Sequence, residues 1–317
     1  MYIKVYHSFG SQHNAIVNGH VLQSEPMQFL KRKTWLWTNI NALVRLFNMN
    51  TIPNVPLVLE VFGNTFYTTS DENGYFEFEF DPQNNIPAGW HAIKISHQHQ
   101  PNLYNEGEIF VPYASSQAII SDIDDTVLKS YSASFIRKIY ELLSKNPHER
   151  RLFDHTVEWY RELAESHPPG SETHPFFYVS SSEWNLYDYL NTIFELNGLP
   201  KGIFLLNHIK SIKQFFKTGK TGHEGKLERI KSLIKAFPEQ EFILIGDNTQ
   251  KDPYIYASIA KAYPDSVIAI FIRNKRPKNQ KATQELLASL NQYHINTCLF
   301  DTTIEAMKRS RELGYIQ

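Results

Sequence analysis

From residue 114 to the end, short apolar runs alternate with segments whose apolar residues recur at helical spacing. The runs that predict strands are 118–120, 176–179, 203–206, 242–245, 267–272 and 297–300. The segments that predict helices are a region ending at 163, then 186–196, 225–237, 252–262, 280–290 and 303–313. Such alternation predicts a three-layer, Rossmann-like α/β domain with a parallel sheet over residues 114–317. Continuous apolar strands fit a sheet buried on both faces.

The stretch before it, residues 51–113, has the period of β-structure instead. Phenylalanine and glutamate alternate through the run 76–80, which predicts a strand with one buried and one solvated face. The Asn73-Gly74 step just before that run supplies the turn chemistry of a hairpin. Further strands are expected at 56–62, 65–69, 90–96 and 108–111. Several short strands in succession predict a small β-sandwich domain.

Residues 1–50 form an N-terminal extension whose clearest feature is an amphipathic helix over 29–47. Apolar side chains fall at helical spacing there, and the basic run 31–33 precedes Trp35 and Trp37. Two interpretations follow from this pattern. A basic helix that carries tryptophan can lie at a membrane surface, or the helix can pack on the β domain that follows it.

Composition excludes several classes of protein. The net charge of the 317 residues is -1, so no overall field attracts nucleic acid. The single cysteine, Cys298, rules out an internal disulfide framework and a multi-cysteine metal site, and we expect no disulfide-linked partner. No secretion signal is recognisable, and no apolar run approaches the roughly 20 residues of a membrane-spanning helix. We expect a cytoplasmic protein, either free in solution or in peripheral contact with a membrane.

Polar side chains follow three of the predicted strands, at the edge where parallel sheets bind ligands. Asp122, Asp124 and Asp125 come directly after the strand 118–120, and their mutual repulsion favours a bound divalent cation. The serines 180–182 follow the strand 176–179, where hydroxyl and backbone N–H groups can hold a phosphate. Gly246, Asp247 and then Asp252 follow the strand 242–245, and Lys226 begins the helix before it. Clustered acids predict a hard cation with oxygen ligands.

In this order, the motifs resemble those of the haloacid dehalogenase superfamily of phosphatases. Its Asp-x-Asp-x-Thr motif is matched by Asp122, Asp124 and Thr126. Its later motifs, a serine, a lysine and a Gly-Asp pair followed by a second acid, are matched by Ser180, Lys226, Asp247 and Asp252. One Asp-x-Asp is common, whereas the ordered set of four motifs is specific. The resemblance implies a sheet of the haloacid dehalogenase type.

Longer strings resemble the App1-type phosphatidate phosphatase family more closely. They are residues 121–127, 177–188, 197–200 and 242–254, with the hairpin 71–80 similar to the β domain of bacterial members. The resemblance implies a magnesium-dependent hydrolase of phosphatidic acid. Two positions differ from the family pattern: Glu183 stands where Pro is usual, and Gly225 stands where His often precedes the lysine.

The resemblance also implies roles for single residues. Asp122 is the nucleophile that forms an aspartyl phosphate, and Asp124 is the general acid and base. Ser180 and Lys226 stabilise charge on the phosphoryl oxygens. The expected magnesium ligands are Asp122, the carbonyl group of Asp124 and Asp247. Asp252 completes the metal site by holding a metal-bound water molecule, or it orients Lys226. The residues expected to bind substrate are Thr126, Ser181, Trp184 and Asn185.

Several of these residues have a structural alternative. Asp125 and Asp252 can be helix-capping acids, and Lys226 can be an exposed helix-start lysine, with Lys220 as the catalytic one. Ser181 and Ser182 can be turn residues, and Trp184 can be packing. The interval 127–152, where a cap would be inserted, is short, so we expect an open site.

The function therefore has three competing readings. The first is a phosphatidate phosphatase, and the second is a phosphatase with the same chemistry that acts on a soluble phosphomonoester, since fold and chemistry do not fix the substrate. The third is a binding or scaffold protein with a decayed phosphatase fold. Intact Asp122, Asp124, Ser180 and Asp247 argue against decay.

Overall fold

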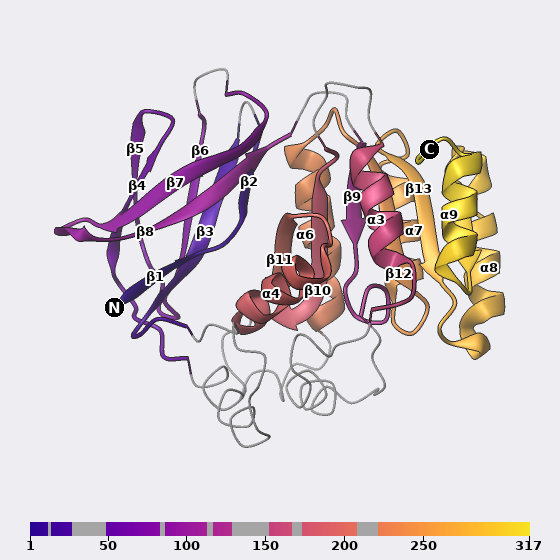
Figure 1. Ribbon diagram of the computed structural model, residues 1–317, viewed down its shortest axis with the longest axis horizontal. Coiled ribbons are helices and arrows are strands. Elements are labelled where there is room, and N and C mark those ends of the chain that lie inside the picture. Colours follow the sequence, from indigo (N-terminus) through magenta and orange to yellow (C-terminus); the bar gives the residue numbers. More distant parts are fainter. Residues whose placement is uncertain are drawn as a thin grey trace. The chain divides into compact units, whose positions relative to one another are not determined.

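The structure, a computed structural model, describes residues 1–11, 14–26, 49–82, 86–112, 117–128, 152–166, 173–207 and 221–317. The chain forms two compact units (Figure 1). Of the described residues, the first unit comprises those up to 112 together with Asn185–Asp188, and the second comprises the others from 117 onward. We call them the β unit and the α/β unit.

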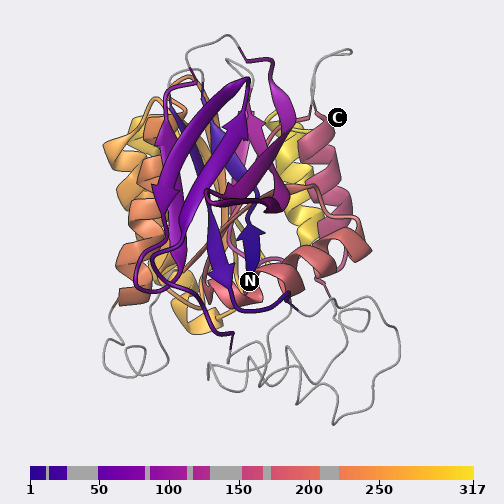
Figure 2. The same cartoon turned by 90° about the vertical axis from the view of Figure 1, so that its left-hand side faces the viewer.

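The β unit is one hydrogen-bonded network of eight strands in the order β1-β3-β2-β8-β7-β4-β5, with β6 paired to β3. Its strands are β1 Tyr2–Val5, β2 Ser8–Gly10, β3 Ala15–Leu22, β4 Pro56–Val61, β5 Asn64–Thr69, β6 Tyr75–Phe80, β7 Gly89–His97 and β8 Gln100–Val111. All neighbours are antiparallel except β2 and β8. Figure 2 shows these strands from the front.

The alternation over 76–80 is confirmed, because Phe76, Phe78 and Phe80 are buried in the apolar core of this unit and the glutamates between them are exposed. The turn before β6 is closed by Asp71, whose carboxylate accepts hydrogen bonds from the N–H groups of Asn73 and Tyr75. The sheet already begins at Tyr2, because β1 pairs with β3, and β2 and β3 pair with the later strands β8 and β6. An antiparallel β unit is therefore established, while the sandwich and the three domain boundaries stay predictions.

The α/β unit contains a six-stranded parallel sheet in the order β11-β10-β9-β12-β13-β14. The strands are β9 Gln117–Ser121, β10 Phe176–Glu183, β11 Gly202–Asn207, β12 Glu241–Asp247, β13 Val267–Arg273 and β14 Asn296–Phe300. The described helices are α3 Thr156–Glu165, α4 Tyr187–Asn197, α6 Thr221–Ala236, α7 Asp252–Ala262, α8 Gln280–Ala288 and α9 Thr303–Glu312, with short turns η2 Trp184–Leu186, η3 Pro277–Asn279 and η4 Asn291–Tyr293. The end of η2 and the start of α4, Asn185–Asp188, are counted with the β unit. Helices cover both faces of this sheet (Figure 2), which confirms the predicted α/β class with a parallel sheet.

The order of the strands reverses at β9, and this reversal determines where a site can form. Strands β10 and β11 follow β9 on one side, whereas β12, β13 and β14 extend from its other side. In parallel sheets the ligand lies beyond the carboxyl ends of the strands, at the point where the order reverses. The buried residues of β9 and β12, such as Ile120 and Leu244, make the centre of the sheet rigid.

Three predictions concern residues outside those that the structure describes. They are the amphipathic helix over 29–47, the alternative lysine Lys220, and most of the short cap interval 127–152. Within the described part of the chain, no helix combines the length and apolar character needed to cross a membrane.

Candidate active site

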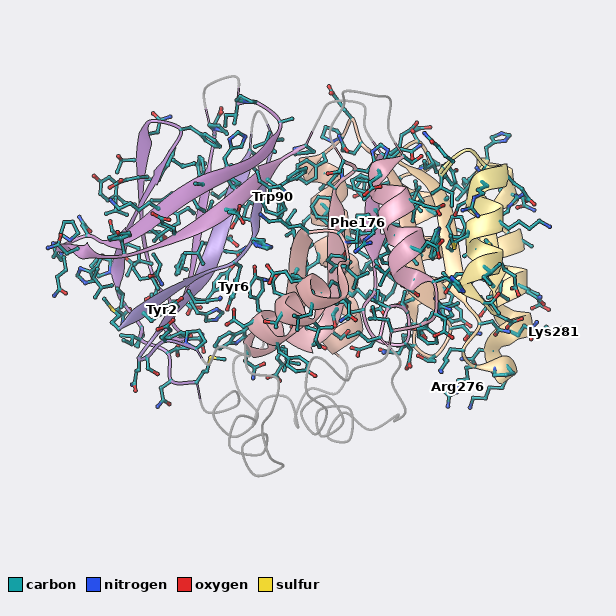
Figure 3. The ribbon with its side chains drawn as sticks, in the orientation of Figure 1. Tyr2, Tyr6, Trp90, Phe176, Arg276 and Lys281 are labelled. Carbon is teal, nitrogen blue, oxygen red and sulfur yellow. The ribbon has the colours of Figure 1, made fainter. Side chains whose placement is uncertain are left out.

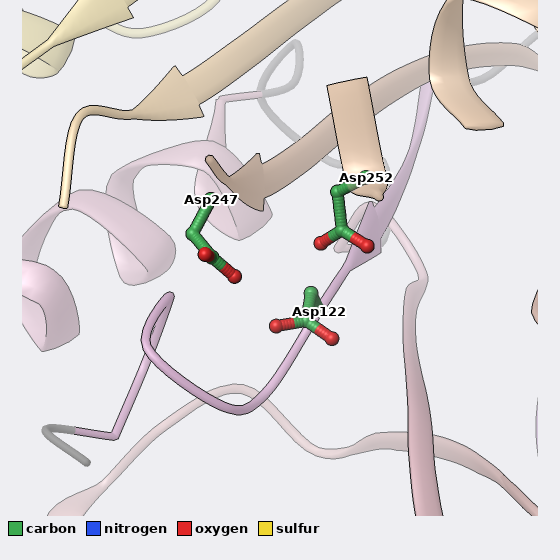
Figure 4. A group of neighbouring side chains, drawn as sticks. All are labelled: Asp122, Asp247 and Asp252. Carbon is green, nitrogen blue, oxygen red and sulfur yellow. The ribbon is translucent and has the colours of Figure 1, made fainter. Parts of the chain in front are cut away.

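Three buried carboxylates converge at the carboxyl edge of the sheet, where its order reverses. Asp122 follows β9, Asp247 ends β12, and Asp252 begins α7. One oxygen from each of them lies within 4.8 Å of the others. Figure 4 shows the three side chains directed toward one another. The sheet therefore brings Asp122 together with Asp247 and Asp252, which come much later in the sequence.

Lys226 of α6 joins two of these carboxylates. Its Nζ donates to Asp122 Oδ1 and to Asp252 Oδ1, each at 2.7 Å. Burial alone would lower the pKa of Lys226, but the two carboxylates outweigh it and raise the pKa above its usual value. The interpretation of Lys226 as an exposed lysine is wrong, since its side chain is only 3% exposed.

One lysine does not balance three carboxylates, and the surplus negative charge fits a cation. Burial, followed by the charge of Asp252, raises the pKa of Asp247 to about 7. Burial likewise raises the pKa of Asp122 well above its ordinary value. Asp247 Oδ2 and Asp252 Oδ2 are buried and have no hydrogen-bond partner among the described residues. Unpaired, buried carboxylate oxygens are the ligands that a hard divalent cation takes.

Gly246 makes this convergence possible. A Cβ atom at this position would lie 2.7 Å from Asp252 Oδ2 and 2.7 Å from Tyr256 Cε2. Gly246→Ala should therefore displace Asp252 and weaken Mg²⁺ binding about 10- to 100-fold, as the loss of groups that orient a metal ligand does. Isothermal titration with Mg²⁺ measures the change. Gly225→Ala is the matched control and should keep its affinity for Mg²⁺, because its Cβ would meet only the flexible end of Arg229, at 3.2 Å. Unchanged affinity in Gly246→Ala would contradict the role of Gly246.

The remaining motif residues surround Asp122. Thr126 Oγ1 donates to Asp122 Oδ2 at 3.2 Å, so Thr126 and Lys226 each hold one oxygen of this carboxylate. Ser180 is buried at β10, and its Oγ accepts a hydrogen bond from the N–H group of Ser182 at 3.0 Å. Ser182 Oγ in turn donates to Asp124 Oδ2 at 3.3 Å. Asp124 and Ser180 are therefore linked through one residue.

The structure places the other substrate-binding candidates near the end of β10. Ser181 lies in β10 and is half-buried, while Trp184 and the buried Asn185 lie in η2. Their contact with a substrate stays a prediction. Asp125 is not part of the carboxylate group that could hold a metal; it occupies a left-handed turn with φ 57°.

Two supporting residues were not singled out from the sequence. Arg229 Nη2 donates to the carbonyl oxygen of Ser180 at 3.0 Å. Arg229 lies one turn after Lys226 on α6, so helical spacing could have indicated that both side chains lie on the same face of the helix. Tyr160 of α3 shares a 2.7 Å hydrogen bond with Ser121 Oγ, which also donates to the carbonyl oxygen of Asp122 at 2.7 Å. Nothing in the sequence pattern indicates this second contact, since Tyr160 is remote from every motif.

Comparison with known proteins agrees with this geometry. Residues 117–274 match the sequence model of the family described as phosphatidate phosphatase APP1, catalytic domain. The chain is 28% identical over 252 residues to phosphatidate phosphatase APP1 of Saccharomyces cerevisiae, which covers 74% of this chain and 40% of the yeast protein. It is 28% identical over 158 residues to an uncharacterized protein of Schizosaccharomyces pombe, which covers 50% of this chain and 25% of that protein. The chain thus spans less than half the length of either relative.

Among solved structures, a carbohydrate acetylesterase from Xanthomonas citri aligns with 97% of this chain and 70% of its own, at 9% identity and a TM-score of 0.35. So low a TM-score establishes no common fold. The sequence matches are informative, because the matched segment includes all three carboxylates and Lys226. The chain belongs to the App1-type phosphatidate phosphatase family, with residues 117–274 as its catalytic domain.

Proposed function

We propose that this protein is a magnesium-dependent phosphatidate phosphatase that hydrolyses phosphatidic acid to diacylglycerol and phosphate. The observation that carries the proposal is the carboxylate of Asp122, held on both oxygens by Lys226 and Thr126 beside two further buried acids. Membership in the App1-type family supports the choice of substrate. The fold of the α/β unit is, on this proposal, of the haloacid dehalogenase type.

Asp122, the carbonyl group of Asp124, Asp247 and Asp252 are the residues that would hold Mg²⁺. When bound, the ion offsets negative charge on the phosphoryl group. Asp122 attacks phosphorus, so that a carboxylate–phosphorus bond forms while the bond to the ester oxygen breaks. Asp124 gives its proton to that departing oxygen and later takes one from the water that releases phosphate from Asp122.

The surrounding residues contribute position and charge. Lys226 and Thr126 fix the rotation of the Asp122 carboxylate, which keeps the attacking oxygen in line with the bond that breaks. The hydroxyl of Ser180 accepts from the N–H group of Ser182, so its own proton is available to a phosphoryl oxygen. Thr126, Ser181, Trp184 and Asn185 complete the proposed substrate-binding set. We place the protein in the cytoplasm, peripheral to the membrane that holds its substrate.

The decisive experiment measures Mg²⁺-dependent phosphate release from phosphatidate, lysophosphatidate, diacylglycerol pyrophosphate, and soluble sugar and nucleotide phosphates. We expect release from phosphatidate, and we expect EDTA to abolish it because the unpaired acids lose their cation. Turnover confined to soluble phosphates would favour a soluble phosphomonoester as substrate. No turnover on any compound, together with retained Mg²⁺ binding, would favour a decayed binding protein.

A further inference from the structure

The loop between β13 and α8 carries a concentration of positive charge. Between Asp265 and Glu285 the sequence contains no acidic residue. The basic residues of that interval are Arg273, Lys275, Arg276, Lys278 and Lys281. Arg273 is buried at the end of β13, where its guanidinium donates to Thr303 Oγ1 at 3.1 Å. The other four are exposed; three lie in the loop and Lys281 lies in the first turn of α8, and we call the four together the cationic loop.

The charges of the cationic loop are available to a partner. Within the described part of the chain, none of its four members forms an ion pair, whereas Lys231 is paired with Glu228 and Lys94 with Glu60. Lys275 Nζ lies 5.1 Å from the centre of the Phe153 ring, and no described carboxylate forms an ion pair with it. Figure 3 shows Arg276 and Lys281 at the outer surface of the α/β unit. Lys251, which precedes α7, is also exposed and has no carboxylate partner among the described residues.

A network of asparagine side chains holds the cationic loop beside the candidate active site. Asn248 directly follows Asp247, and its side chain donates to Asn274 Oδ1 at 2.7 Å. Asn248 Oδ1 accepts from the N–H group of Arg276 at 2.7 Å, and its carbonyl oxygen accepts from Asn279 Nδ2 at 2.6 Å. Asn248 is itself 1% exposed, and its three hydrogen bonds are partly shielded from water. The loop is therefore fixed to the residue next to Asp247.

Two large apolar side chains are exposed at the same edge of the sheet. Tyr254, in the first turn of α7, is 58% exposed, and Ile304, in the first turn of α9, is 59% exposed. Both helices begin after strands of the sheet, β12 and β14, so their first turns lie at its carboxyl edge. The exposed acids at this edge include Asp154, before α3, and Asp301 and Glu305, at the start of α9; Asp301 accepts from Asn274 Nδ2 at 2.8 Å. The cationic side of the edge is thus the side nearer Asp247.

We propose that the cationic loop docks this edge of the α/β unit on the surface of a bilayer that contains anionic lipids. The choice of a bilayer rests on the proposed function, because a phosphatase of phosphatidate meets its substrate there. Unpaired cations complement anionic headgroups, and exposed Tyr254 and Ile304 match the interfacial layer beneath them. The asparagine network then sets the distance between the lipid surface and Asp247.

Vesicle sedimentation of the full chain in EDTA tests the proposal without any turnover. The probes are vesicles of phosphatidylcholine alone and vesicles that also contain phosphatidylserine. We expect binding to the second only, and weaker binding at high salt. The triple change Lys275→Glu, Arg276→Glu and Lys278→Glu should weaken this binding at least ~10-fold, given the contribution of each cation near an anionic surface. Because all three side chains are exposed, the melting temperature should stay close to that of the unchanged protein.

The matched control changes net charge equally on other faces, with Lys235→Glu, Lys261→Glu and Lys308→Glu, all exposed. It should keep vesicle binding within about twofold, since Lys235 and Lys261 lie in the last turns of their helices, at the opposite edge. Equal loss in both triple variants, or equal binding to both kinds of vesicle, would overturn the proposal. So would binding to a DNA duplex as tight as to the anionic vesicles. If phosphate release fails on every substrate while vesicle binding behaves as expected, the proposed reaction is wrong and the docking surface stands.

Discussion

Asp122→Asn is expected to lower phosphate release by roughly 10⁴-fold or more, the scale on which the loss of a nucleophile acts. The amide has the shape of the carboxylate but does not attack phosphorus. The fold should survive, because Lys226 keeps its 2.7 Å ion pair with Asp252 and one carboxylate fewer reduces the repulsion at the site. Phosphate release from phosphatidate and the thermal melting temperature, measured on the same preparation, check both parts.

Asp125→Asn is the control for this change. Asp125 lies three positions further along, lies outside the carboxylate cluster and has φ 57°, which asparagine adopts readily. It should keep most of the activity. If Asp122→Asn retained turnover within about tenfold of the unchanged protein, the assignment of the nucleophile would be wrong. Equal losses in both variants would point to a general disturbance of this turn.

Lys226→Met is expected to lower the free energy of unfolding by about 3–5 kcal/mol without metal, because it leaves buried carboxylates with no cation. Lys226 is fully enclosed and bonded to two of them, so solvent does not screen the loss. Mg²⁺ should restore part of the lost stability, since it supplies the missing positive charge. Phosphate release should fall roughly 10²- to 10³-fold even at saturating Mg²⁺, as the loss of a group that stabilises transition-state charge does. Urea unfolding with and without Mg²⁺ measures both changes in the free energy of unfolding.

Lys231→Met, on the same helix, is the matched control. Lys231 pairs with Glu228 at the surface, and such pairs contribute less than about 1 kcal/mol. If the two variants unfolded at the same urea concentration, the ion pairs of Lys226 would not support the site. If Mg²⁺ stabilised the Lys226→Met variant no more than the unchanged protein, Lys226 and Mg²⁺ would not be offsetting the charge of the same carboxylates.

The sequence predicted the α/β unit well because its signals are local. Each strand is a continuous apolar run, and each helix has its own period, so β12 and α7 were predicted within a residue or two of their observed bounds. The strands within residues 2–22 were harder to predict, and they were not identified from the sequence. Val17 and Val21 alternate with polar neighbours as in a strand, but His20 is buried as well, because its Nδ1 shares a 2.9 Å hydrogen bond with the hydroxyl of Tyr6. That pairing depends on the folded sheet.

The same distinction applies to the candidate site. Asp122 and Asp247 were predictable, since a strand end is visible in the sequence and parallel strands bring such ends together. Lys226 was identified by its place in the order of motifs; the helix expected to begin at 225 begins at Thr221, so Lys226 lies in its second turn. The contacts of Ser182 with Asp124, and of Tyr160 with Ser121, were not. They depend on how a turn and a helix pack, and a serine or tyrosine in those places looks like any other. Sequence patterns thus located the charged groups, and the structure added the neutral groups that hold them.

Strand β9 lies in the middle of its sheet, with β10 on one side and β12 on the other, and this arrangement has a consequence for synthesis. A chain that is still growing can pair β9 with β10 early, but the other edge of β9 has no neighbour until β12 has been made. Asp122 and Lys226 are 104 positions apart, and such distant pairings are slow to form and leave strand edges exposed to other chains meanwhile. Asp122, the proposed nucleophile, is therefore among the first residues of the parallel sheet to be translated and among the last to acquire its full set of neighbours.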